Sequence, residues 1–141
     1  MGNWNDVKNY IKANFTGINE DGNSLIFGFD LGNGRTQSVI VQGDDAAIEI
    51  MSGIGPVDRI DANRMFQVAN ENPAPGGLWK NGDIYTWNAT MSTGSIQGPD
   101  LQTFILLVVE AADALEQDLG LGPGPHLADD YPVRAHPEGV L

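Results

Sequence analysis

The pair Asn-Gly occurs twice in this sequence, at residues 33–34 and 81–82, each time between two runs rich in strand-forming residues. Both residue types tolerate positive φ, which is the backbone geometry that a two-residue hairpin turn requires. Large apolar residues alternate with small or polar ones over residues 24–31, and an extended apolar run resumes at residues 39–41. The pattern therefore predicts two β-hairpins and, with them, an antiparallel sheet.

A further extended run and three amphipathic segments complete the expected fold. Residues 46–52 follow a Gly-Asp-Asp turn and extend the first hairpin to a three-stranded meander. Helical periodicity covers residues 3–15, 61–69 and 100–119, with Asn3 and Asp61 as N-caps of the first two. We expect an α+β fold of order α-β-β-β-α-β-β-α, in which an antiparallel sheet of about five strands carries helices on one face.

The 141 residues suit a single domain. Every periodic segment lies within residues 1–120, which form the expected α+β domain. Prolines and glycines interrupt residues 121–141, so that we expect an irregular tail there. Because 41% of the residues are hydrophobic, the chain can build a core despite its 18 glycines and 8 prolines.

The charge balance excludes some classes of partner. Seven basic residues stand against 19 acidic ones, a formal net charge of −12, which repels phosphate backbones and argues against a nucleic-acid partner. The longest fully apolar run covers residues 104–109, far short of the roughly 20 residues that span a bilayer. With no cysteine and no basic-then-apolar signal pattern at the start, we expect a cytoplasmic protein without a membrane partner.

No motif in the sequence predicts catalysis. The glycine-rich stretches do not open a helix as phosphate-binding loops do, and no GxSxG sequence is present. The two histidines, His126 and His136, lie in the irregular tail, where we expect solvent and not a metal site. Acidic residues on the last helix fall opposite its apolar stripe and are expected in water; they are Glu110, Asp113, Glu116 and Asp118. We therefore expect no catalytic residue, no metal and no cofactor.

The last predicted helix is apolar over more than one face. At about 100° per residue, one stripe runs from Leu101 to Leu119, but Leu106 and Leu107 project outside it. The first two turns are therefore apolar nearly all round, and Val109 follows them in the third turn. A subunit interface, a partner peptide or a covering loop would each explain this. We interpret Leu106, Leu107 and Val109 as candidate residues for binding a partner or a second copy.

A second candidate surface is aromatic. Trp79, Tyr85 and Trp87 gather on the second hairpin, and such side chains often anchor protein interfaces. Packing in the core against the helices is the alternative explanation. The sequence leaves both open.

The order of elements and two short patterns carry a resemblance to a known family. Residues 65–72 form a short helix with an Asn-rich end before a strand pair, and residues 112–116 read Ala-Asp-x-Leu-Glu within the final helix. Over residues 1 to about 120, the chain resembles the type III secretion chaperone-like superfamily, and within it the YbjN-type domains. The resemblance implies a small acidic cytoplasmic protein, commonly dimeric, that binds peptide segments of client proteins along apolar grooves without enzymatic activity.

Two functional hypotheses follow. The first is a non-enzymatic, chaperone-like domain, homodimeric, that captures a segment of a partner protein through apolar contacts on its helices and strand edge. The alternative is an acidic immunity or inhibitor-type protein, whose negative surface neutralises a basic enzyme. High salt should weaken the second kind of binding steeply and the first kind little. A small-molecule sensor or enzyme that uses the Asp/Glu cluster would need a concave pocket lined by polar groups.

Overall fold

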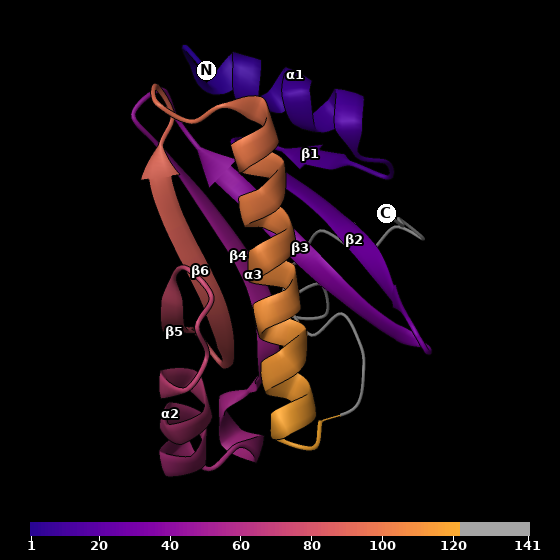
Figure 1. Cartoon of the computed structure of the whole chain (residues 1–141), viewed down its shortest axis with the longest axis vertical. Coiled ribbons are helices and arrows are strands. Elements are labelled where there is room, and N and C mark those ends of the chain that lie inside the picture. Colours follow the sequence, from indigo (N-terminus) through magenta and orange to yellow (C-terminus); the bar gives the residue numbers. More distant parts are fainter. Residues whose placement is uncertain (122–141) are drawn as a thin grey trace.

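The structure is a computed structural model that describes residues 1–121. The tail expected at residues 121–141, with both histidines, therefore lies outside the described residues except for Leu121. Figure 1 shows helices and strands packed around one sheet. The elements are α1 (Trp4–Asn14), β1 (Asn19–Asp21), β2 (Ser24–Gly32), β3 (Arg35–Gly43), β4 (Ala47–Pro56), the 3-10 turn η1 (Val57–Arg59), α2 (Ala62–Asn70), β5 (Gly77–Asn81), β6 (Ile84–Ser92) and α3 (Gly98–Asp118).

One antiparallel sheet contains all six strands, in the order β1-β2-β3-β4-β6-β5. The α+β class, the meander and the second hairpin are thus confirmed. The sheet has one strand more than expected, because β1 consists of three polar residues without any apolar alternation that a sequence pattern could detect. β6 lies between β4 and β5, so β5 forms one edge of the sheet.

The two Asn-Gly pairs form turns in different ways. Asn33 and Gly34 occupy the two turn positions between β2 and β3, with φ of 55° and 75°, as the sequence predicts. In the second hairpin Asn81 is instead the last residue of β5, and the turn consists of Gly82, with φ of 64°, and Asp83. The second hairpin is confirmed, but its two-residue turn lies one residue later than predicted, at residues 82–83 instead of 81–82.

Both expected N-caps are present. The side chain of Asn3 accepts a hydrogen bond from the backbone N–H of Asp6 at 2.9 Å. Asp61 accepts one from the N–H of Arg64 at 2.9 Å. Each carboxyl or amide oxygen thereby satisfies one of the backbone donors that a helix leaves without a partner in its first turn.

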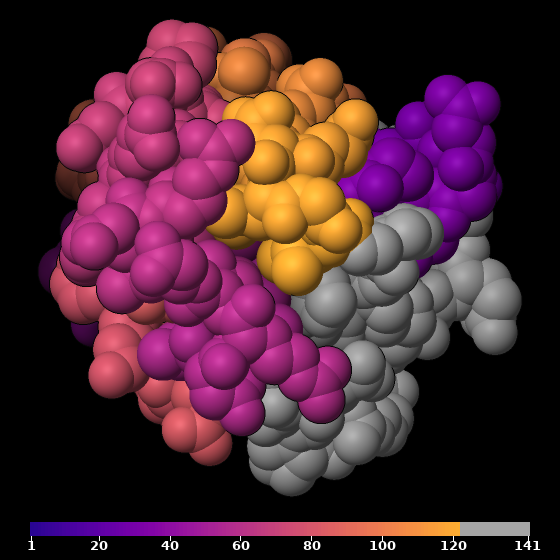
Figure 2. All heavy atoms as spheres, turned by 90° about the horizontal axis from the view of Figure 1, so that it is seen from below, coloured from indigo at the N-terminus to yellow at the C-terminus, as the bar shows by residue number. Residues whose placement is uncertain are grey.

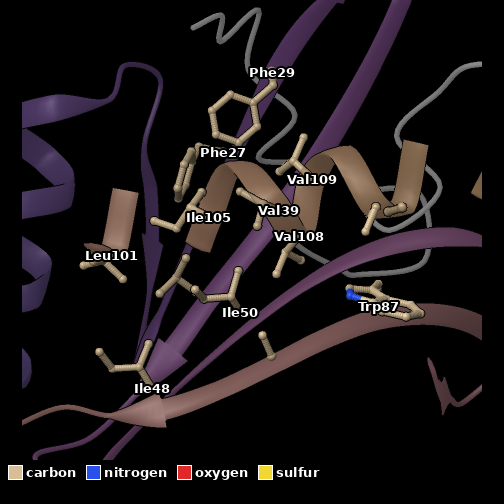
Figure 3. Packing of buried hydrophobic residues seen from close by; sticks show 14 of the residues in the cluster. Phe27, Phe29, Val39, Ile48, Ile50, Trp87, Leu101, Ile105, Val108 and Val109 are labelled. Atoms are coloured by element: carbon tan, nitrogen blue, oxygen red, sulfur yellow. The ribbon is translucent and has the colours of Figure 1, made fainter. Parts of the chain in front are cut away.

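The core lies between the sheet and the helices α1 and α3, which cover the same face (Figure 1). Figure 3 shows how Phe27 and Phe29 of β2, Ile50 of β4 and Ile105 of α3 converge there, each at most 1% exposed. The alternation in β2 directs its two phenylalanines toward the helices, whereas Ile26 pairs with Ile40 on the other face. In the described part of the chain, no helix is long and apolar enough to cross a membrane.

Two acidic residues of α3 do not lie in water as expected. Glu110 and Asp118 are exposed, but Asp113 is only 8% exposed and Glu116 is fully buried. Helical periodicity could not reveal this, because the burial depends on Arg35, which comes from the distant strand β3 and lies beside both carboxylates.

Truncating the side chain of Ile105 should test the core. We expect Ile105→Ala to lower the free energy of unfolding by about 2–5 kcal/mol, because it removes buried methyl groups and leaves a cavity between α3 and the sheet. Urea unfolding followed by circular dichroism would measure this. Glu110→Ala, on the exposed side of the same helix, is the matched control and should change the free energy by no more than about 0.5 kcal/mol.

Candidate partner-binding surface

A groove lies where helix α2 passes beside the edge strand β5. It encloses a cavity of about 650 Å³. Its apolar lining comes from Phe66 and Ala69 of α2, Leu78 of β5, and Tyr85 and Trp87 of β6. Asn70, Asn72 and Lys80 add polar groups. We call this the α2–β5 groove; it combines an apolar floor with amide and ammonium groups that can bind the backbone of a peptide.

Two large apolar side chains at this end of the molecule remain in solvent. Phe66 is 54% exposed and Trp79 is 56% exposed, and among the described residues these are the exposed large hydrophobics. Phe66 borders the groove. Trp79 lies on the other face of β5, because successive strand residues alternate and its neighbours Leu78 and Lys80 both line the groove. The edge strand therefore has an exposed aromatic side chain near each of its faces.

Of the predicted aromatic residues, Trp79 is thus exposed, while Tyr85 and Trp87 are 5% and 3% exposed and form the floor of the groove. The indole N–H of Trp87 donates a hydrogen bond to the carbonyl of Pro75 at 2.9 Å. This bond holds the segment between α2 and β5 against the sheet. Strand alternation determines which of these aromatic side chains share a face of the sheet. Only the tertiary structure shows which of them are buried.

Gly76 allows that segment to approach β6. Its φ is 106°, and a Cβ atom placed there would lie 2.2 Å from the carbonyl oxygen of Asn88. Only glycine fits both the backbone conformation and the space. The wall of the groove therefore depends on one glycine in the segment that follows α2.

The candidate residues of α3 lie away from this groove. Val109 is fully buried in the core, between the helix and the sheet (Figure 3). Leu106 and Leu107 are half-buried, and Leu106 packs against the margin of the core. Leu107 thus keeps part of its apolar surface in solvent without any large exposed apolar area around it.

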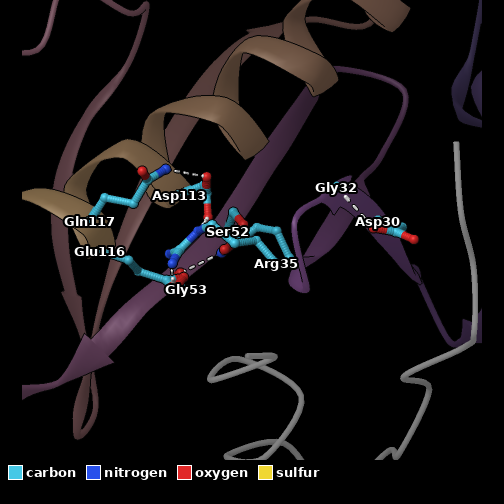
Figure 4. Close-up of polar contacts among 9 residues, drawn as sticks. Asp30, Gly32, Arg35, Ser52, Gly53, Asp113, Glu116 and Gln117 are labelled. Atoms are coloured by element: carbon cyan, nitrogen blue, oxygen red, sulfur yellow. Dashed lines mark hydrogen bonds and ion pairs between the residues drawn. The ribbon is translucent and has the colours of Figure 1, made fainter. Parts of the chain in front are cut away.

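The C-terminal half of α3 carries a buried ionic cluster (Figure 4). Arg35 donates from Nε to Asp113 Oδ1 at 2.7 Å, and its Nη2 lies 3.9 Å from Glu116 Oε2. Asp113 accepts a second hydrogen bond, from Gln117 Nε2 at 2.8 Å. Burial, and after it the negative charge of Asp113, raises the pKa of the Glu116 carboxyl to about 9, against the smaller opposing effect of Arg35.

The end of α3, which carries the buried ionic cluster, also contacts helix α2, which forms one wall of the α2–β5 groove. Arg64 of α2 donates from Nη2 to the backbone carbonyl of Asp118 at 3.4 Å. Figure 2, which views the molecule from below, shows the α2 region in magenta directly beside the yellow end of α3. The position of α2, and with it one wall of the groove, therefore depends on the last turn of α3.

Comparison with known proteins identifies the fold. No family model and no curated protein matches this sequence. A chain of the HopA1–SchA chaperone–effector complex superimposes with a TM-score of 0.53 at 12% identity, over 70% of this chain and 78% of that one. The fold is type III secretion chaperone-like. A chain of the heterodimeric ExoU–SpcU complex from the type III secretion system of Pseudomonas aeruginosa agrees, with a TM-score of 0.50 and 15% identity over 65% of this chain and 82% of that one.

The sequence contained a signal for part of this surface. Phe66 lies within the second predicted helix, at residues 61–69, and adds a large apolar side chain next to Met65. In the structure Met65 and Val68 face the core and Phe66 does not. A nine-residue helix has room for only one narrow buried stripe, so an additional large apolar residue beside that stripe indicates a surface for binding.

Replacing Gly76 tests how the groove wall is held. We expect Gly76→Ala to destabilise the protein by at least about 1 kcal/mol, because the new methyl group would collide with the Asn88 carbonyl at a positive φ. Gly77→Ala is the matched control, since a Cβ at the next residue meets no atom within 4 Å. Urea unfolding of both variants measures the difference, and equal stability would contradict this account of the wall.

Proposed function

We propose that this protein is a non-enzymatic, chaperone-like domain that binds a segment of a partner protein in the α2–β5 groove. The observation that carries the proposal is the exposure of Phe66 and Trp79 on either side of an edge strand. Exposed apolar groups of this size next to a free strand edge are a liability in a monomer unless a partner covers them. The type III secretion chaperone-like fold supports the same function.

The groove suits an extended segment with apolar side chains. Its floor of Leu78, Tyr85 and Trp87 offers apolar contact, and Asn70 and Asn72 offer amide groups to the backbone of the segment. The outer edge of β5 can pair with an extended chain. The proposed partner is therefore a protein segment that is unfolded or detachable and not a small metabolite.

The proposal includes three finer points. The protein acts in the cytoplasm, it forms a homodimer, and it is a YbjN-type domain. The half-buried pair Leu106 and Leu107 supplies the contact between two copies, since a neighbouring helix would cover the apolar surface that they leave in solvent.

A binding experiment tests the groove. The protein is isolated gently with any bound chain, the bound segment is identified and synthesised, and its affinity is measured by calorimetry. We expect Phe66→Ala to weaken binding at least tenfold, because exposed aromatic anchors dominate such interfaces. Leu31→Ala, which removes a partly buried apolar side chain from β2, is the matched control and should leave the affinity within about twofold.

The same titration repeated at low and high salt separates the two candidate functions. Binding through the apolar groove should keep its affinity. An acidic inhibitor that acts through the net charge of −12 should instead lose most of its affinity at high salt. If the bound chain is a folded basic enzyme and Phe66→Ala binds it normally, the groove is not the binding site.

The dimer has a separate test. We expect the native protein to have a mass of about 30 kDa, twice the 15.1 kDa of one chain, and the double variant Leu106→Asp, Leu107→Asp to be a folded monomer. Light scattering after size exclusion measures the mass, and circular dichroism checks the fold. Thr103→Asp, at an exposed position on the same helix, is the control and should remain dimeric. A double variant that stays dimeric would place the interface elsewhere.

A further inference from the structure

The α2–β5 groove differs in charge from the chain as a whole. The chain has 19 acidic and 7 basic residues, yet among the described residues that line the groove Lys80 is the only charged one. Glu71, which lies between two lining residues in the sequence, and Asp83, in the turn after β5, are exposed and do not belong to the lining. The groove therefore has a positive group on the surface of a strongly acidic protein.

Lys80 also differs from the other two lysines of the chain in its contacts. Lys8 lies 3.0 Å from a carboxylate oxygen of Glu20, and Lys12 contacts the other oxygen of the same group. Among the described residues, Lys80 forms no ion pair. Its ammonium group, at the end of a flexible side chain, is therefore available to a group that enters the groove.

A second hydrogen-bond donor lines the groove. Asn72 Oδ1 accepts a hydrogen bond from the backbone N–H of Ala74 at 2.9 Å, so the amide hydrogens of Asn72 are the part of its side chain that can bind a partner. The indole N–H of Trp87, by contrast, already donates to the carbonyl of Pro75. The groove thus offers an ammonium group and an amide donor above an apolar floor. A carboxylate, which only accepts hydrogen bonds, suits both donors.

The pairing of β5 determines where a bound strand presents such a group. Asn81 and Ile84 flank the two-residue turn at residues 82–83. In a hairpin of this kind the flanking pair exchanges backbone hydrogen bonds, and bonded pairs alternate with unbonded pairs along the ladder. Leu78 and Lys80 belong to the unbonded pairs, so their backbone N–H and C=O groups point to the open edge. A strand bound there places the residues opposite these two on the groove face.

We propose that the bound segment carries an aspartate or glutamate side chain, which Lys80 binds in the groove, and an apolar side chain two residues away, which packs beside Leu78. This inference rests on the proposed function, since it assigns a partner chemistry to the same groove. The residue between the two lies on the other face, where the exposed Trp79 favours an apolar group. The spacing of two residues holds for either direction of the bound strand.

The rest of the surface limits how many acidic residues the segment can contain. Outside the groove the net charge of −12 repels a segment with many carboxylates. This repulsion is screened beyond about 8 Å at physiological salt, whereas a carboxylate in contact with Lys80 lies well within that distance of the ammonium group. The segment therefore has a single acidic residue among uncharged ones. An acidic inhibitor would select a basic partner instead.

A peptide selection tests the proposal. The full chain is used to select binders from a displayed library of random nine-residue peptides, which are then synthesised with blocked ends so that no terminal carboxylate contributes. We expect the selected peptides to carry one aspartate or glutamate two residues from a large apolar residue. Replacing that acidic residue by its amide should weaken binding about two- to fivefold, as expected for one exposed ion pair, and replacing it by lysine at least about tenfold, measured by calorimetry.

The reciprocal change is made in the protein. Lys80→Glu should weaken binding of the acidic peptide about tenfold and should bind its lysine-substituted form more tightly than the acidic form. Lys12→Glu is the matched control, because it changes the net charge equally on α1, at the opposite end of the molecule from α2 (Figure 1). It should leave both affinities within about twofold. Circular dichroism checks that both variants fold.

The variants distinguish failure of this inference from failure of the proposed function. Peptides that lose affinity in Phe66→Ala but bind Lys80→Glu as tightly as the wild-type protein would overturn the role of Lys80 and leave the groove as the binding site. Selected peptides without an acidic residue would do the same. Peptides that bind Phe66→Ala normally, or a selection that yields no peptide, would overturn the groove and with it this inference.

Discussion

The packing of α3 across the middle of the sheet is the interaction on which the rest of the structure depends. The helix contacts β3, β4 and β6 beneath it, α1 beside its first half and α2 near its end. Its buried residues, among them Leu101, Ile105, Val108 and Leu115, have no contact with water. Burial of such side chains stabilises a fold by about 1.5–3 kcal/mol each, an upper estimate. A helix with this many contacts fixes where the shorter elements can lie.

The two halves of α3 bury different kinds of surface. The first half packs aliphatic side chains against β2 and β4, and it tolerates half-buried leucines on its flank. The second half brings carboxyl groups against β3, where Arg35 meets Asp113 and Glu116. Removing one partner from such a buried cluster is costly, because the remaining charge has no compensation. Arg35 therefore links the second half of α3 to β3.

The proposed binding surface arises because the sheet ends at β5. A central strand has neighbours on both sides, whereas β5 pairs, among the described residues, with β6 alone, and α2 lies beside it without closing the space. The α2–β5 groove, with Phe66 and Trp79 in solvent, is a consequence of this arrangement. Among the described residues, the outer edge of β5 thus remains without a paired strand.

Local sequence patterns predicted most helices, strands and caps, but they predicted strand pairing and the position of one turn less well. The hairpin at Asn33-Gly34 and the caps at Asn3 and Asp61 depend on backbone geometry within a few residues, and the structure contains them all. The three polar residues of β1 carry no such pattern, and the strand exists because β2 pairs with it. The turn at residues 82–83 differs from the expected one because cross-strand pairing sets the register there.

The sequence by itself determined the antiparallel sheet, the order of the elements and the amphipathic helices, since turn chemistry and periodicity are properties of neighbouring residues. Only the tertiary structure decided which aromatic side chains remain in solvent. Trp79 and Trp87 lie on strands of the same hairpin, yet Trp79 on the edge strand β5 is exposed, while Trp87 on β6, between β4 and β5, is buried. The same holds for Glu110 and Glu116, which differ in burial because Arg35 and the sheet lie beside only one of them.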